Sequence, residues 1–454
     1  MKTRFMRIVA STLALATIMT VTAGCSGNSA SSGSTGGAAA SAAGSSSAAS
    51  TGGAKSDVTL NLLWPSSNAV AGINAEVAAF EKKTGIKTNI ELTATGSELD
   101  NIVKSRIATN DLPDILGYNC GSLLSPLNPE NNFLDLTNES FMQNVDDDFK
   151  KAVTVNGKQY GIPSQEMSVG CVVYNKKIYK ELNLTVPKTW KEFIANCDKI
   201  KAAGKTAILG SNKDSWTSQV LILGDYYNIE KANPTFADDY TANKAHYADT
   251  PAALRGFEKL AQLKSGGYLN KDYMSVSYSD GEKLITEGSA AHWFILSQCL
   301  GDISTKYPDK VNDLDVFPIP SDDAKINGFT VWEPTAFYFS KSSDKIDAMK
   351  QWAAFMVSDE ALQAYSGAEK LFGPYALKNA KLPDDVIPAV KTLQSYIIAG
   401  NGTAALEFKS PVKGPNLMNI CVECMSGQKS AADCAKEYDN DVKQQAKQLN
   451  LKGW

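Results

Sequence analysis

Histidine and arginine are scarce in this chain of 454 residues. Two histidines leave no basis for a metal site built mainly from imidazoles, so we expect neither a metal nor another cofactor. Few guanidinium groups are available to clamp phosphates or carboxylates. A net charge of −4 also disfavours nucleic acid, whose partners usually carry basic faces. The residues concerned are His246, His292, Arg4, Arg7, Arg106 and Arg255.

Cysteine is sparse for a chain of this length, with eight residues in all. Setting Cys25 aside leaves an odd number, which excludes a dense disulfide scaffold. Cys421 and Cys424 form the one tight pair, without a second pair or a histidine nearby. We interpret them as two small core residues on one helix face, while redox or metal chemistry is the alternative.

Long apolar runs are missing after the first 25 residues, although a membrane helix needs about 18 such residues. The start of the chain is basic and then apolar, which predicts a secretory signal peptide over residues 1–24. Ala23 and Gly24 precede Cys25, as in a bacterial lipobox, so we expect a lipid anchor on Cys25. An ordinary signal peptide cleaved nearby is the alternative.

Residues 25–56 consist almost entirely of serine, alanine, glycine and threonine. Such a composition buries too little apolar surface to offset the entropy of an ordered chain, so it predicts a flexible tether. A long tether behind a lipid anchor suits the extracellular face of a Gram-positive cell membrane.

Strand and helix patterns alternate along the rest of the chain. The apolar run 58–64, the helical pattern 71–83 closed by Gly85, and the alternating segment 86–92 predict a β-α-β unit with parallel strands. Asn156-Gly157 predicts a hairpin, and Thr189 with Glu192 has capping-box spacing at the start of a helix. Helical spacing assigns Trp190 and Trp352 to cores. The pattern indicates an α/β protein of two lobes.

Several motifs in order then resemble the family 1 extracellular solute-binding proteins of ABC transporters, which include the maltodextrin-binding protein. The resemblance covers the chain from Val58 to Trp454 and is carried by the segments 78–86, 111–115, 160–163, 172–176, 187–193, 317–320, 352–360 and 425–432. It implies an α/β, two-lobed, periplasmic-binding-protein-like fold of type II, whose lobes are joined by crossover strands with a ligand cleft between them. One lobe would comprise residues 57–166 and 335–373, and the other residues 167–334 and 374–454.

The resemblance also implies a monomeric binding protein, not an enzyme, that captures a carbohydrate by lobe closure and delivers it to an ABC import permease. Sugars present apolar faces and rings of hydroxyls, so their sites combine aromatic platforms with carboxylates and amides. The candidate ligand-binding residues are Trp64, Tyr118, Asn119, Gln165, Glu166, Trp216, Gln298, Trp332 and Glu333. Alternatives stay open for some of them: Trp64 as a lobe-surface aromatic, Glu166 as a solvated loop charge and Trp332 as simple packing.

Gln298 marks a departure from the family pattern, which usually places a stacking tryptophan there. We expect either Trp293 or Trp332 to take over stacking, or the ligand to differ from a common maltodextrin. Two other functions remain open. One is a receptor for a polyamine, peptide or other solute. The other is a secreted carbohydrate-active enzyme, which would require two carboxylates at a defined separation, with Glu166 and Glu333 as the candidates.

Overall fold

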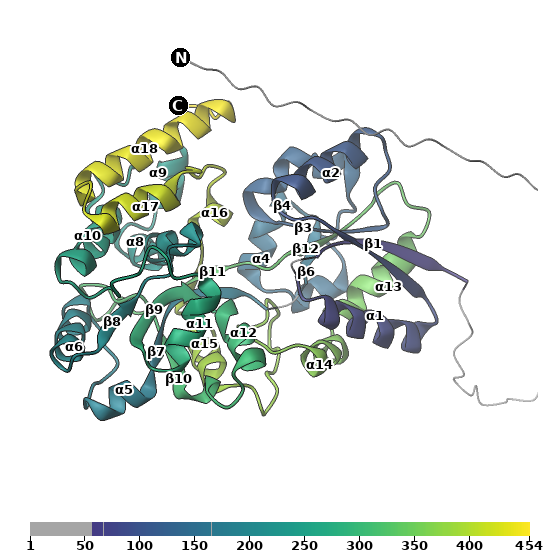
Figure 1. Cartoon of the computed structure of the whole chain (residues 1–454). Coiled ribbons are helices and arrows are strands. Elements are labelled where there is room, and N and C mark those ends of the chain that lie inside the picture. Colours follow the sequence, from purple (N-terminus) through teal and green to yellow (C-terminus); the bar gives the residue numbers. More distant parts are fainter. Residues whose placement is uncertain (1–56, 67, 165) are drawn as a thin grey trace, which may run out of the picture. The chain divides into compact units, whose positions relative to one another are not determined.

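The computed structural model describes residues 57–66, 68–164 and 166–454 of the chain (Figure 1). The predicted signal peptide, tether and lipid-anchor residue Cys25 lie outside the described residues, as does Gln165. Within the described ranges, no helix combines the length and the apolar character that crossing a membrane requires.

The first sheet contains five strands in the order β2-β1-β3-β12-β6. Strand β1 is parallel to β2 and β3, while β12 is antiparallel to both β3 and β6. The parallel pairing of β1 and β2 confirms the predicted β-α-β unit. The strands are β1 (Thr59–Pro65), β2 (Lys87–Thr93), β3 (Ile115–Tyr118), β6 (Gly161–Pro163) and β12 (Ala336–Phe339).

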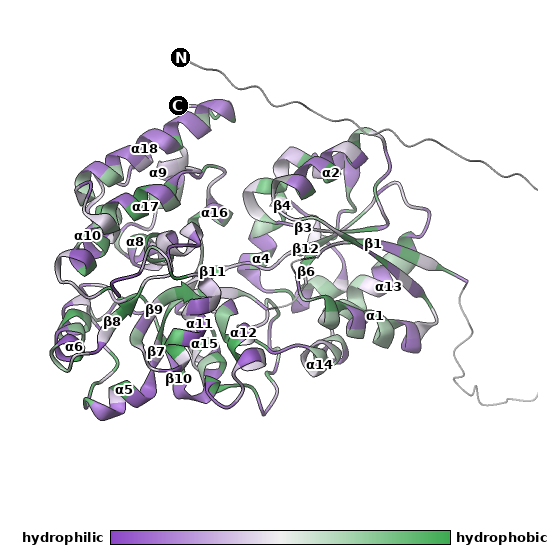
Figure 2. Cartoon of the chain, in the orientation of Figure 1, coloured by the Kyte–Doolittle hydropathy of each residue, from purple (hydrophilic) through white to green (hydrophobic). Residues whose placement is uncertain are grey.

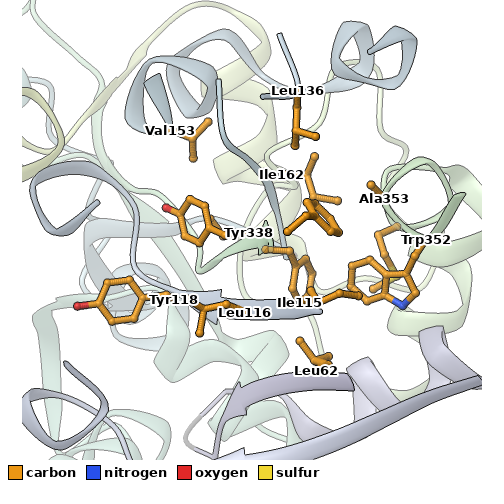
Figure 3. Close-up of a cluster of buried hydrophobic side chains, with 14 of the residues drawn as sticks. Leu62, Ile115, Leu116, Tyr118, Leu136, Val153, Ile162, Tyr338, Trp352 and Ala353 are labelled. Carbon is orange, nitrogen blue, oxygen red and sulfur yellow. The ribbon is translucent and has the colours of Figure 1, made fainter. Parts of the chain in front are cut away.

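The helices that accompany this sheet form the first lobe with it. Helix α1 ends at Gly85, whose φ of 77° is the left-handed conformation expected of a C-terminal cap. Figure 3 shows Trp352 beside Leu62 and Ile115 in the buried cluster of this lobe, as predicted for that tryptophan. The elements are α1 (Val70–Thr84), α2 (Ser97–Ala108), η1 (Gly121–Leu123), η2 (Ser125–Leu127), α3 (Pro129–Asn132), η3 (Ser140–Asn144), α4 (Asp147–Ala152), α13 (Ile346–Met356) and α14 (Asp359–Ala368).

The second sheet has the order β13-β11-β7-β9-β8, and β10 pairs with β7. The strands of this second lobe are almost wholly buried and apolar, and they appear mostly green in Figure 2, whereas helix α18 is largely hydrophilic. The strands are β7 (Ser168–Asn175), β8 (Thr206–Leu209), β9 (Ala290–Leu296), β10 (Leu314–Phe317), β11 (Phe329–Trp332) and β13 (Gly402–Ala404).

Helices occupy most of the remaining second lobe. Trp190, Cys421 and Cys424 are buried there, in agreement with their interpretation as core residues. The elements are α5 (Lys176–Glu181), α6 (Trp190–Ala202), η4 (Ser215–Gln219), α7 (Val220–Gly224), α8 (Tyr226–Ala232), α9 (Phe236–Thr241), α10 (Pro251–Ser265), α11 (Tyr278–Thr286), α12 (Gln298–Lys306), η5 (Val311–Asp313), α15 (Pro388–Ile398), α16 (Leu406–Lys409), α17 (Leu417–Ser426) and α18 (Ala431–Gln448).

The predicted hairpin is confirmed, and the predicted capping box is confirmed in its first half. Asn156 and Gly157 turn the chain between β4 (Thr154–Val155) and β5 (Lys158–Gln159), both with positive φ, as a type I′ hairpin requires. At the start of α6, the Thr189 hydroxyl accepts the N–H of Glu192. The Glu192 carboxylate bonds to the N–H of Lys188, not to that of Thr189, so the reciprocal half of the capping box is shifted by one residue.

The chain passes between the two sheets three times. The first passage joins β6 to β7, the second joins β11 to β12, and the third follows α14. On the third passage, the Ala376 carbonyl accepts the N–H of Asp146 and the Lys378 N–H donates to the Asn144 carbonyl, so the chain leaves the first lobe after residue 378.

Candidate ligand-binding site

A cavity of about 420 Å³ lies where the three passages meet, and we call it the crossover cavity. Its walls come from the loop after β1, the three passages, one side of α12 and the end of α14. Both lobes therefore contribute side chains. The lining residues are Asn68, Ala69, Ser164, Glu166, Ser168, Gln298, Gly301, Asp302, Thr305, Trp332, Glu333, Pro334, Thr335, Tyr365, Glu369, Lys370 and Phe372.

Backbone hydrogen bonds hold the passages beside one another. The N–H of Ser164 donates to the carbonyl of Thr335 at 2.9 Å, which ties the first passage to the second. The N–H of Met167 donates to the carbonyl of Pro374 at 2.7 Å, which ties the first to the third. Next to this bond, a Cβ on Gly373 would stand 1.9 Å from the Met167 carbonyl oxygen, so only glycine permits the approach.

Trp332 supplies an aromatic wall of the cavity and is held from two sides. Its ring packs against Gly170 of β7, where an added Cβ would stand 2.8 Å from the ring. Its indole N–H donates to the carboxylate of Glu407 at 2.5 Å, and Glu407 in turn pairs with Lys413 at 3.3 Å. The half-buried ring is thus fixed as a platform beside the cavity.

Glu166 and Glu333 are carboxylates buried in the cavity wall, with 3% and 8% of their surface exposed. Burial raises the pKa of Glu166 to about 7, although the Tyr365 hydroxyl and the Phe372 N–H act to lower it. Burial also raises the pKa of Glu333 well above its ordinary range. Within the described residues, Oε2 of Glu333 has no hydrogen-bond partner, and a buried acceptor in that state favours a ligand with a donor.

Two further carboxylates and one lysine complete the charge of the cavity. Asp302 accepts the hydroxyl of Tyr278 at 2.8 Å. Glu369 accepts the N–H of Gly72 at 3.0 Å, in the first turn of α1, where the helix dipole favours a negative group. Lys370 is exposed at the rim. Carboxylates therefore outnumber cationic side chains in the lining of this cavity.

The structure brings four of the predicted site residues together at this cavity: Glu166, Gln298, Trp332 and Glu333. Gln298 opens α12 and is half-buried in the wall, so its amide is available where a stacking tryptophan was expected from the family pattern. Trp293, the other candidate for stacking, is buried and donates its N–H to the Ser211 hydroxyl at 3.1 Å. Trp332 is the tryptophan that faces the cavity.

Trp64 and Tyr118 do not line the crossover cavity, because both are buried in the first lobe. The Trp64 ring lies against Gly117 and stacks on Phe337 with 5.1 Å between ring centroids. The Tyr118 hydroxyl donates to Asp100, and Figure 3 shows the side chain within the cluster of this lobe. Trp64 lies near the end of β1 and Tyr118 ends β3, but both side chains point into the buried interior of the lobe.

Asn119 and Trp216 also lie away from the cavity. Asn119 is exposed, and its carbonyl accepts the hydroxyl of Tyr338 at 3.0 Å. Trp216 is half-buried in η4, with its ring 5.4 Å from that of Tyr278. Neither lines the crossover cavity.

Other lining residues were absent from the sequence prediction. Asn68 follows the first strand, and its Nδ2 donates to the Thr335 hydroxyl at 2.8 Å; its position after a strand was a signal that could have identified it. Tyr365, Glu369 and Phe372 come from a helix end and an irregular segment that carry no motif.

Comparisons with known proteins agree with this architecture. Residues 75–392 match the profile of the family described as bacterial extracellular solute-binding protein. The multiple sugar-binding protein of Streptococcus mutans serotype c (strain ATCC 700610 / UA159) is 22% identical over 334 residues, which cover 71% of this chain and 76% of that protein. The melibiose/raffinose/stachyose-binding protein MelE of Bacillus subtilis (strain 168) is 26% identical over 175 residues, or 35% of this chain and 40% of that protein.

A solved structure shows the same fold. The apo form of RafE from Streptococcus pneumoniae superposes with a TM-score of 0.71 at 19% identity, and the alignment covers 86% of this chain and 99% of RafE. These relatives are binding proteins and not enzymes, which supports the predicted absence of an enzymatic activity. The chain therefore belongs to the bacterial extracellular solute-binding proteins of ABC transporters, as its motifs predicted.

Proposed function

We propose that this chain is a receptor that captures a carbohydrate, with an oligosaccharide as the expected ligand, in the crossover cavity and delivers it to an ABC import permease. The observation that carries the proposal is the Trp332 platform beside the buried carboxylates of Glu166 and Glu333. An aromatic face suits the C–H surface of a sugar ring, and carboxylates accept its hydroxyls. The names of the relatives, which include a multiple sugar-binding protein and RafE in complex with raffinose, support the same ligand class.

The proposal includes capture by hinge closure, with the three passages as the hinge. It also includes secretion, a lipid anchor on Cys25 and a tether over residues 25–56, so that a monomeric receptor stays near its permease on the extracellular side of the membrane. The tether would keep the local concentration of receptor high, which reduces the docking affinity that delivery needs. The family assignment supports the extracellular or periplasmic location.

Thermal unfolding in the presence of a glycan panel tests the proposed function. At least one oligosaccharide is expected to raise the melting temperature, because a ligand that binds only the folded state stabilises it by about 2.7 kcal/mol at a hundredfold excess over Kd. The panel should contain matched glucose, N-acetylglucosamine and glucosamine oligomers besides raffinose-type and maltose-type sugars. If no glycan shifts the transition while a peptide or a polyamine does, the carbohydrate assignment is wrong.

Trp332→Ala is expected to weaken binding of the glycan found in that panel by about 1–3 kcal/mol, since a desolvated aromatic platform contributes strongly to binding. Isothermal titration calorimetry measures the change. Trp454→Ala serves as the matched control, because this tryptophan lies in the second lobe, where its N–H donates to the Thr241 carbonyl at 2.9 Å, and it does not line the crossover cavity. An unchanged affinity in the Trp332 variant would show that this ring does not contribute to ligand binding.

A further inference from the structure

We propose that the ligand carries a protonated amino group, which binds at Glu333 beside the face of Trp332, so that amine-bearing glycans are the preferred class. This inference rests on the proposed function and specifies its ligand. Its basis is a charge imbalance in the crossover cavity together with a carboxylate oxygen that the protein itself leaves unsatisfied. Of the ionisable groups that line the cavity, Glu166, Asp302, Glu333 and Glu369 are acidic, and Lys370 is basic.

Glu333 is a buried carboxylate that the protein leaves without a paired cation. It is 8% exposed, and its Oε2 has no hydrogen-bond partner in the described part of the chain. The two lysines whose charges reach it are bound elsewhere: Lys151 pairs with Asp148 at 2.7 Å, and Lys409 pairs with Glu230. A buried carboxylate without a paired cation is costly, so its environment favours a ligand that brings the cation.

The other groups around Glu333 do not supply that charge. The carboxylate of Glu407, on α16, accepts the indole N–H of Trp332 and pairs with Lys413. Cys120, on the first-lobe side, lies near both Glu333 and Glu407. Its thiol donates to the Pro334 carbonyl at 3.6 Å. Burial raises the pKa of this thiol, so it stays neutral. The Glu407 carboxylate and the Cys120 thiol therefore supply no positive charge to Glu333.

An ammonium group matches this environment in two respects. It can donate to Oε2 of Glu333 and compensate the charge of the carboxylate at the same time. Placed over the Trp332 face, it also gains a cation–π interaction, which a neutral hydroxyl lacks. A sugar hydroxyl can satisfy the hydrogen bond, but it does not stabilise the ionised form of the Glu333 carboxylate as an ammonium group does.

Calorimetry with three β-1,4-linked oligomers of equal length, built from glucose, N-acetylglucosamine and glucosamine, tests the inference on the wild-type protein at pH 7. These differ only at C2. The glucosamine oligomer is expected to bind at least tenfold more tightly than the other two. If a neutral oligomer of this or another linkage in the panel binds as well or better, the amine inference is overturned and the carbohydrate receptor stands. If spermidine binds and no glycan does, the carbohydrate function is overturned.

Glu333→Gln separates charge from hydrogen bonding, because the amide keeps the shape and an acceptor oxygen. The variant is expected to reduce affinity for the glucosamine oligomer at least tenfold and to change the affinity for the neutral oligomers by less than threefold. Glu360→Gln is the control, since Glu360 is exposed at α14 and pairs with Lys83. An equal loss for charged and neutral oligomers would overturn the assignment of the amine to Glu333. Should the variant fail to fold, the oligomer series on the wild type decides alone.

Discussion

Lys259→Met is expected to lower the free energy of unfolding by about 3–5 kcal/mol at pH 7, because it leaves a buried carboxylate without its cation. Lys259 donates to Asp225 at 2.6 Å, and both side chains are 1% exposed. Burial raises the pKa of Asp225 in spite of this lysine, which shows how strongly the surroundings disfavour the bare charge. Asn228 also donates to Asp225, at 2.6 Å, and cannot replace the lost charge.

Urea unfolding of the single and double variants measures this effect. Adding Asp225→Asn to Lys259→Met should recover a large part of the lost stability, because the double variant buries no charge at this position. Arg255→Met provides a comparison at the partly exposed neighbour, which pairs with Asp322 at 2.7 Å, and is expected to cost less. A cost below about 1 kcal/mol for Lys259→Met would contradict the role of this pair.

Glu166→Gln is expected to remove a pH dependence of stability worth about 3 kcal/mol. Burial raises the pKa of Glu166 from 4.5 to about 7, so the folded state holds this proton more tightly than the unfolded chain does. Below pH 4.5 the carboxyl is protonated in both states and costs nothing. As the pH rises from 4.5 to 7, the unfolded chain ionises first, and the stability contributed by the protonated group is lost.

The measurement is the difference in unfolding free energy between wild type and Glu166→Gln at pH 4.5 and at pH 8. Between pH 4.5 and pH 8, the unfolding free energy of the variant should rise by about 3 kcal/mol relative to that of the wild type. Tyr365, Phe372 and Glu369 face this carboxylate in both proteins and are unchanged. The exposed Glu360→Gln variant, which removes a surface carboxylate, is measured alongside as the control. A constant difference for Glu166→Gln would mean that the carboxylate is not held in a protonated state.

The candidate site was only partly predictable from the sequence. Trp332 and Glu333 could be found because they stand at the end of a strand on a passage between lobes, and the family resemblance places ligand groups there. Trp64 also ends a strand, yet it is buried. Successive side chains of a strand alternate between two faces, and whether a helix covers a given face depends on packing that the strand itself does not encode.

By itself, the sequence determined the local elements and their class. The Asn156-Gly157 turn, the Gly85 cap and the helical spacing around Trp190 and Trp352 depend on neighbours a few residues away, where backbone sterics and hydrophobic periodicity suffice. The family motifs then determined the two-lobed architecture.

Only the tertiary structure decided which side chains share the crossover cavity. Glu369 reaches the first turn of α1 from a position 297 residues away in the chain, and Asn68 meets Thr335 across 267 residues. Lys259 and Asp225 pair because α10 packs beside α8 and the buried acid needs a cation. Such contacts depend on how whole layers pack and on which charges are buried by that packing. Local sequence patterns therefore do not predict them.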